Sequence, residues 1–346
     1  MRIVYSDRHF GHKDRVEPVG ATFVAVSEVP ERASAILREV TARRLGDVSP
    51  PVESGLAPIL AVHSPEYVDF LSSAWRLWTE TGRSGPIVPS FWRMRPAGMR
   101  PGLGVENMVD YYARDPGVCL VEGSWEAILY SSYCATTAAA CVASGDQAVF
   151  ALCRPPGHHA GPDIMAGSCF LNNAAIAAAQ LSRQTSQRVA VLDLDYHHGN
   201  GTQEIFYESD QVLTCSIHAD PQTAYPFYTG AAEEKGRGKG EGLNINLPLQ
   251  PGCAFDRWSG ALGMALDAIR EFGAETVVIA LGVDTYKDEP NPTCHFQLES
   301  EDFLRAGEMI GALGLPTVIT MEGGYNLDML GINVANFLEG FASASG

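Results

Sequence analysis

The chain has 346 residues, of which 46% are hydrophobic, and a formal net charge of −17. This length can bury a large core, as one big α/β domain or two ordinary ones. The negative charge argues against nucleic acid and anionic membranes as partners; it is compatible with a cationic substrate, although solubility alone would also account for it.

The cysteines and the apolar segments bear on the cellular compartment. The eight cysteines include no C-x-x-C pair, and most lie in apolar segments, so we interpret them as reduced core residues of an intracellular protein. The start of the chain, MRIVYSDRHF, has no apolar signal segment. No apolar run reaches the roughly 18 residues of a membrane span. We therefore expect a cytoplasmic protein without a membrane partner.

Strand-like and helix-like segments alternate along the chain. Apolar and β-branched runs predict strands at residues 2–5, 148–153, from 189, 211–218, 276–281 and 316–321. Helical spacing or Ala-rich composition predicts helices at 30–44, from 64, 124–144, 173–183, 256–272, from 300 and from about 332. Because crossovers through helices build parallel sheets, this order predicts a single α/β domain over residues 1–346, with helices on both faces.

Residues 82–123 interrupt this alternation. The segment is rich in proline and glycine and holds several arginines and acids, among them Glu106 and Asp115. Long stretches with little regular structure are usually functional or interface loops. We interpret the segment as a candidate substrate lid and dimer contact; the alternative is a solvated loop.

Four predicted strands end in turns rich in chemically reactive side chains. These turns hold His158-His159, residues 193–198, Asp284 and Tyr325. Because ligands bind at the carboxyl ends of parallel strands, we expect the four turns to lie together at one edge of the sheet. Asp195 and His197 are two residues apart and point to the same side of an extended segment. With Asp284 they offer three ligands to zinc or a similar divalent metal, which leaves the open position of a catalytic site.

The other side chains of these turns suit hydrolysis. The adjacent pair His158-His159 can supply a general base and a general acid. Asp193, two residues before Asp195, could hold an imidazole N–H. Two glycines precede Tyr325 and free the backbone to bring its hydroxyl toward an oxyanion. Each turn alone could be an ordinary polar turn, but together they predict a mononuclear metal hydrolase.

The blocks RPPGHH, DLDYHHGNGT, GVDT and EGGY resemble the four blocks of the histone deacetylase family, and the similarity covers nearly the whole chain. The length and the long loop most resemble its bacterial acetylpolyamine amidohydrolase branch. The resemblance implies an arginase–deacetylase fold with a central eight-stranded parallel sheet, and one Zn²⁺ per subunit. It implies hydrolysis of a small cationic acetylated amine, such as acetylputrescine, acetylcadaverine or acetylspermidine. From the long loop we expect a narrow entrance completed by a second subunit, in a homodimer formed through residues 82–123.

The resemblance assigns catalytic roles by position. The zinc ligands would be Asp195, His197 and Asp284. His159 would be the general base, with Asn200 behind it where the eukaryotic enzymes usually have Asp. His158, paired with Asp193, would stay positively charged. Tyr325 would polarise the acetyl carbonyl together with zinc.

The resemblance also assigns substrate contacts. The Gly167 carbonyl would accept the substrate amide N–H. Tyr225 would form one aromatic wall of the tunnel, whereas the second wall falls on Ser168. Glu106 matches a substrate-facing acid of the polyamine branch, and Asp115 lies close to the position of a second acid.

A monovalent cation site, for K⁺ or Na⁺, is implied beside the zinc. It would use Asp193, Ser216 and the backbone carbonyls of Asp195, His197 and Ile217.

Alternatives remain open at this stage. The chemistry would also suit a deacetylase of acetyl-lysine in proteins, or a catalytically silent binder of acetylated ligands. A ureohydrolase with two manganese ions is disfavoured, because Gly199 and Gly282 stand where that family has Asp. The ligand set could also hold Fe²⁺ or Co²⁺. Residues 286–295 are longer than usual, which leaves the preferred substrate open.

Overall fold

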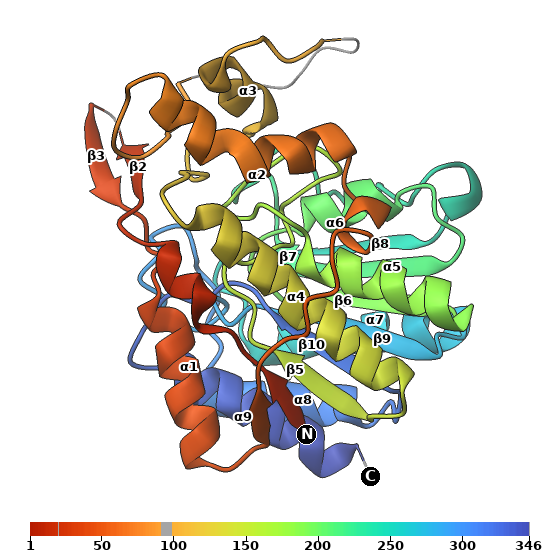
Figure 1. The fold of residues 1–346 in the computed structure, drawn as a ribbon. Helices are drawn as coiled ribbons and strands as arrows, with labels where there is room; N and C mark the ends of the chain where they lie inside the picture. Colours follow the sequence, from red (N-terminus) through yellow and green to blue (C-terminus); the bar gives the residue numbers. More distant parts are fainter. Residues whose placement is uncertain (20, 91–98, 346) are drawn as a thin grey trace.

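The computed structural model describes residues 1–19, 21–90 and 99–345. In this part of the chain, eight parallel strands form one sheet in the order β4-β1-β5-β10-β9-β6-β7-β8 (Figure 1). Their bounds, in that order, are Asp47–Ser49, Arg2–Val4, Ala148–Ala151, Thr317–Met321, Thr276–Leu281, Val189–Asp193, Val212–Ala219 and Asn244–Leu249. The expected α/β fold with an eight-stranded parallel sheet is confirmed.

The central strands are runs of apolar and β-branched residues. β6, β9 and β10 read VAVLD, TVVIAL and TVITM, and all of their residues are buried. Val189 and Val191 of β6 join one hydrophobic cluster, whereas Ala190 and Leu192 join another. Since successive strand residues point to opposite faces, this alternation gives the sheet a core on each side.

Helices cover both faces of the sheet (Figure 1). Those in the described residues are α1 (Glu31–Ala42), α2 (Pro65–Glu80), α3 (Val105–Tyr112), α4 (Ser124–Ala143), α5 (Asn173–Thr185), α6 (Asn200–Phe206), α7 (Phe255–Phe272), α8 (Ser300–Gly311) and α9 (Leu330–Ala344). The Ala-rich α4 and α5 pack on one face, and α1, α7, α8 and α9 build the core on the other. None of these helices is both long and apolar enough to cross a membrane.

The segment 82–123, predicted to have little regular structure, is partly ordered. It contains α3, and Ile87 forms a β-bridge with Leu120. These residues and Val105 join α2 in a third hydrophobic cluster. Apart from α3 and isolated β-bridges, the described residues of the segment belong to no helix or strand, as predicted; α3 was missed because glycines and prolines flank its short apolar stripe. Residues 91–98 of the segment lie outside the described residues.

Several short elements were not predicted from the residue pattern. β2 (Val16–Val19) and β3 (Thr22–Ala25) pair as an antiparallel hairpin. β4 has three residues, and β8 carries Pro248 at the edge of the sheet, where a missing N–H is tolerated. These elements lack the long apolar runs that mark the buried central strands.

Candidate active site

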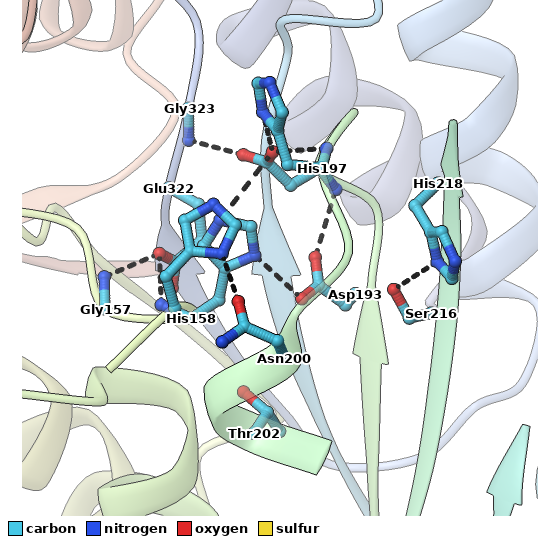
Figure 2. Close-up of polar contacts among 12 residues, drawn as sticks. Gly157, His158, Asp193, His197, Asn200, Thr202, Ser216, His218, Glu322 and Gly323 are labelled. Atoms are coloured by element: carbon cyan, nitrogen blue, oxygen red, sulfur yellow. Dashed lines mark hydrogen bonds and ion pairs between the residues drawn. The ribbon is translucent and has the colours of Figure 1, made fainter. Parts of the chain in front are cut away.

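Four strand ends meet at one edge of the sheet. β5, β10, β9 and β6 are consecutive neighbours, and Asp193 at the end of β6 lies opposite Ala280 of β9. Met321, at the end of β10, lies opposite Leu281 of β9. The turns that follow these strands therefore lie together, as strand order predicts. Figure 2 shows His158, Asp193, His197 and Gly323 converging from these turns.

The three candidate metal ligands face one another. Nδ1 of His197 lies 3.2 Å from Oδ1 of Asp195 and 3.2 Å from Oδ2 of Asp284. All three side chains are buried, and Oδ2 of Asp284 accepts no hydrogen bond from the residues that the structure describes. Burial and then the Asp195 carboxylate raise the pKa of Asp284. Two buried carboxylates and an imidazole whose donor atoms face one another are a donor set that fits a divalent metal.

Backbone donors hold the two carboxylates in place. The Gly323 N–H donates to Oδ2 of Asp195 at 2.8 Å, and the Tyr196 N–H donates to Oδ1 of Asp284 at 2.8 Å. A Cβ on Gly282 would lie 2.3 Å from Oδ2 of Asp195. The glycine that argued against a ureohydrolase is therefore also required sterically, because the Cβ would also lie 2.5 Å from Cα of Asp195 and no side chain fits unless that backbone moves.

His158 forms an ion pair with Asp193, at the end of β6, and also lies close to Asp195. Its Nδ1–H donates to Oδ2 of Asp193 at 3.0 Å, and its Nε2 lies 3.7 Å from Oδ1 of Asp195 (Figure 2). Burial alone would lower the pKa of His158, but the Asp195 and Asp193 carboxylates outweigh it and raise that pKa to about 10. The sequence-based pairing of an imidazole with Asp193 agrees with this geometry.

His159 is prepared for the opposite protonation state. Because Oδ1 of Asn200 can only accept, the 2.7 Å contact assigns a proton to Nδ1 of His159 and leaves Nε2 free. Burial, followed by the charges on His158 and His197, lowers the pKa of His159 well below 6.5. The two adjacent histidines therefore differ in charge, one cationic and one neutral.

Tyr325 sits on the irregular turn after β10. Its ring lies under the Arg32 guanidinium, 4.8 Å from ring centroid to Cζ. Arg32 donates from Nε to the Gly324 carbonyl at 2.7 Å and from Nη2 to the Glu322 carbonyl at 2.5 Å. Burial raises the pKa of Tyr325 well above 10.0 in spite of this guanidinium, so the hydroxyl keeps its proton.

A buried ionic cluster supports this turn. The Glu28 carboxylate contacts Arg32 at 3.0 Å, Arg154 at 2.8 Å and also Arg15. Burial would raise the pKa of Glu28, but the three guanidinium groups outweigh it and lower that pKa below 4.5. One carboxylate thus links Arg15, just before β2, and Arg154, before the His158 turn, to Arg32 of α1, which holds the Tyr325 turn.

Replacing Glu28 by Gln should lower the free energy of unfolding by about 3–5 kcal/mol at neutral pH, because three buried guanidinium groups lose their counter-charge. A carboxylate with a depressed folded-state pKa stabilises the fold above its unfolded pKa and loses that contribution as pH falls through the folded value. The difference in the free energy of unfolding between wild type and Glu28→Gln should therefore become smaller below pH 4.5. Urea unfolding across that range measures it.

The control is Glu271→Gln, which changes an exposed carboxylate on α7. It should leave stability unchanged within about 0.5 kcal/mol. An equal loss of stability in both variants would contradict the assigned role of Glu28. So would a difference in stability between wild type and Glu28→Gln that grows in acid.

A cavity of about 420 Å³ opens over the candidate catalytic side chains. It is lined by Glu17, Val26, Ser27, Glu28, Asp115, Pro116, Gly117, His159, Gly167, Ser168, His197, Tyr225, Pro290, Asn291, Pro292, Thr293 and Tyr325. No Lys or Arg is among these lining residues. The cavity therefore joins His159, His197 and Tyr325 to a wall that holds Glu17 and Asp115.

Asp115 organises one wall from within. Its carboxylate accepts hydrogen bonds from the Gly167 N–H, the Tyr225 hydroxyl and the Gly117 N–H, at 2.7, 2.7 and 2.8 Å. Gly167 must be glycine, since a Cβ there would lie 2.3 Å from the His159 ring. Ser168, on the same turn, donates to the Gly117 carbonyl at 3.3 Å. These contacts place Gly167, Ser168 and Tyr225 in one wall, with Asp115 as their support.

Glu106 lies elsewhere. It is on α3, pairs with Arg83 and is not among the residues that line the cavity. Its expected role as a substrate-facing acid therefore stays a prediction. The same holds for the monovalent cation site, although Asp193 and Ser216 are register partners on β6 and β7 and share a small polar cavity of about 10 Å³.

Some residues of the site were missed in the sequence. Cys294 lies within 4.8 Å of donor atoms on His197 and Asp284, and burial raises its pKa to about 12, which keeps it a neutral thiol. Glu17 of the hairpin lines the cavity, and Glu322 accepts hydrogen bonds from the backbone of the His158 turn. Only Glu322 had a signal, its place in EGGY.

Known proteins share this architecture. The model of the histone deacetylase domain matches residues 26–341. Acetylpolyamine amidohydrolase 2 of Pseudomonas aeruginosa is 46% identical over 341 residues, covering 99% of this chain and 98% of that protein. Acetylpolyamine amidohydrolase of Mycoplana ramosa is 41% identical over 342 residues, covering 99% and 100%.

Solved structures agree. The crystal structure of an acetylpolyamine aminohydrolase from Burkholderia pseudomallei matches with a TM-score of 0.93 and 38% identity, over the full length of both chains. The HDA15 HD domain matches with a TM-score of 0.81 and 25% identity, covering 100% of this chain and 89% of that one. The matched regions contain all four turns of the site.

Proposed function

The chain belongs to the histone deacetylase family and is a hydrolase, and we propose that it deacetylates small N-acetylated polyamines and diamines. The substrates would be acetylputrescine, acetylcadaverine and acetylspermidine, and the products acetate and the free amine. The observation that carries the proposal is the cavity, which joins His159, His197 and Tyr325 to acidic walls without a Lys or Arg among its lining residues.

The proposed cofactor is one Zn²⁺ ion, with Fe²⁺ or Co²⁺ as alternatives. Asp195, His197 and Asp284 would hold it, and Oδ2 of Asp284 supports this assignment, because it lies 3.2 Å from Nδ1 of His197 and accepts no hydrogen bond from the described residues. When bound, the metal would supply Lewis-acid chemistry to the acetyl carbonyl and to the attacking water.

The side chains around the cavity would carry the remaining steps. Nε2 of His159 would take a proton from the attacking water and return it to the leaving amine. Tyr325 would donate a hydrogen bond to the acetyl oxygen as that oxygen gains negative charge. His158, paired with Asp193, would stay cationic and favour the same charge. The Gly167 carbonyl would accept the substrate amide N–H.

The hairpin residue Glu17 supports a cationic substrate. A Cβ on Gly117 would lie 3.1 Å from Oδ1 of Asp115 and 3.4 Å from Oε2 of Glu17, so the two carboxylates flank one point of the wall. Burial and then the Asp115 carboxylate raise the pKa of Glu17. Among the described residues, the Glu17 side chain forms no hydrogen bond or ion pair. An ammonium group on the substrate tail would give it a partner.

The proposal is tested by acetate release from zinc-loaded protein. The panel contains acetylputrescine, acetylcadaverine, the acetylspermidines, an acetyl-lysine peptide and N-butylacetamide, which lacks the terminal ammonium of acetylputrescine. We expect kcat/KM for acetylputrescine to exceed that for N-butylacetamide by about tenfold or more, about 1.4 kcal/mol. Comparable turnover of the peptide would favour a protein deacetylase, and no turnover of any acetylated amine would contradict the proposal.

Glu17→Gln should raise KM for acetylputrescine about tenfold while kcat changes little, because the carboxylate would bind the tail equally in the ground and transition states. Turnover of N-butylacetamide should not change. Steady-state kinetics on both substrates measure the difference.

The matched control is Glu122→Gln, which removes an exposed acid of the long segment outside this cavity. If both variants raise KM for acetylputrescine equally, general charge attraction explains the effect, and Glu17 has no specific role.

A further inference from the structure

The turn that carries Tyr325 has no regular structure of its own. Residues 322–326 belong to no helix or strand, and Gly324 adopts a φ of +123°. Arg32 holds the Glu322 and Gly324 carbonyls from one side. The N–H of Tyr325 points to a different partner and donates to Oε2 of Glu289 at 3.1 Å.

Glu289 belongs to the segment 286–295, which follows the Asp284 turn. A second contact ties this segment to the same place, because Nδ2 of Asn326 donates to the Asp288 carbonyl at 2.8 Å. The residues immediately after Glu289, namely Pro290, Asn291, Pro292 and Thr293, line the catalytic cavity. One side chain therefore connects the cavity wall to the backbone of Tyr325.

We infer that Glu289 is a positioning residue, whose carboxylate fixes the Tyr325 turn against the segment 286–295 and so sets the place of the Tyr325 hydroxyl in the cavity. Arg32 restrains the residues before Tyr325, and Glu289 restrains Tyr325 itself. The kinetic consequence rests on the proposed function, since it requires Tyr325 to act on the acetyl oxygen. The structural consequence, the position of the Tyr325 ring, does not depend on the proposed function.

The structural test compares crystal structures of wild type, Glu289→Ala and Glu289→Gln. Gln keeps an oxygen acceptor of the same reach. It also resembles the protonated form of Glu289, which is accessible because burial raises the pKa of Glu289 to about 7. The Ala variant should show a displaced Tyr325 ring, and the Gln variant should not. An unmoved Tyr325 in the Ala variant would overturn the inference, whether or not the protein deacetylates polyamines.

The kinetic test uses acetylputrescine. Glu289→Ala should lower kcat about 10- to 100-fold with little change in KM, and Glu289→Gln should restore most of the rate. In a Tyr325→Phe background, Glu289→Ala should lower kcat by less than about a further twofold, because the two changes remove the same interaction of the Tyr325 hydroxyl. Additive losses would show that Glu289 acts through something other than the Tyr325 hydroxyl.

The matched control is Asp288→Ala, which removes an exposed carboxylate from the same segment and leaves the Tyr325 N–H contact in place. It should retain wild-type kcat. A loss equal to that of Glu289→Ala would assign the effect to general disturbance of the segment and overturn the specific role of Glu289.

Discussion

Asp284→Asn is expected to reduce kcat/KM for acetylputrescine by on the order of 10³-fold, because it removes one of three proposed ligands. The amide keeps the shape of the side chain and the Oδ1 acceptor for the Tyr196 N–H, so the fold should persist. Zinc content after dialysis should fall from about one ion per chain toward none.

A readout independent of activity accompanies this experiment. Adding zinc should raise the Tm of wild type, because a ligand that binds only the native state stabilises it, and this rise should be lost in Asp284→Asn. Without metal, the variant should be at least as stable as wild type, since burial and Asp195 both raise the pKa of Asp284 and disfavour its charge. Full zinc binding by the variant would contradict the ligand assignment.

Tyr325→Phe is the second large expected effect. Loss of one hydrogen-bond donor to a developing oxyanion typically costs about 10²- to 10³-fold in kcat. KM should change only a few-fold, because the contact strengthens as charge develops. Zinc content should be that of wild type, since Tyr325 is not a proposed ligand.

Measurement of kcat and KM for acetylputrescine, with metal analysis of the same preparation, separates the possible causes. An unchanged kcat with a raised KM would mean that Tyr325 binds substrate and takes no part in the chemical step. A loss of zinc would instead indicate that the turn after β10 had moved, because the neighbouring Gly323 N–H holds the Asp195 carboxylate.

The sequence was most informative where chemistry follows a buried strand. β6, β9 and β10 are apolar and β-branched runs, and such runs predict buried parallel strands without knowledge of their partners. The rule that parallel strands present their carboxyl ends at one edge then brings Asp195, His197 and Asp284 together. The short edge strands β4 and β8 carried no such signal, because edge strands bury less and tolerate polar residues and proline.

The walls of the cavity depended on contacts that no local pattern encodes. Asp115 was expected close to the position of a substrate-facing acid; it lines the cavity, and its carboxylate also accepts hydrogen bonds from the Gly167 N–H and from Tyr225, which is 110 residues away in the chain. Glu106 was expected to face the substrate. Its carboxylate instead pairs with Arg83, and the residue does not line the cavity. A carboxylate on a long segment can serve substrate, fold or solvent, and only its neighbours decide which.

The sequence by itself determined the fold class, the family and the residues that converge at one edge of the sheet, because strand periodicity and ligand chemistry are local and strand order does the rest. Only the tertiary structure placed Glu28 among three arginines, Glu17 beside Asp115, and Glu289 on the Tyr325 N–H, 36 residues along the chain. These acids are buried or half-buried by packing between distant segments. Their partners, and hence their roles, arise when the chain folds.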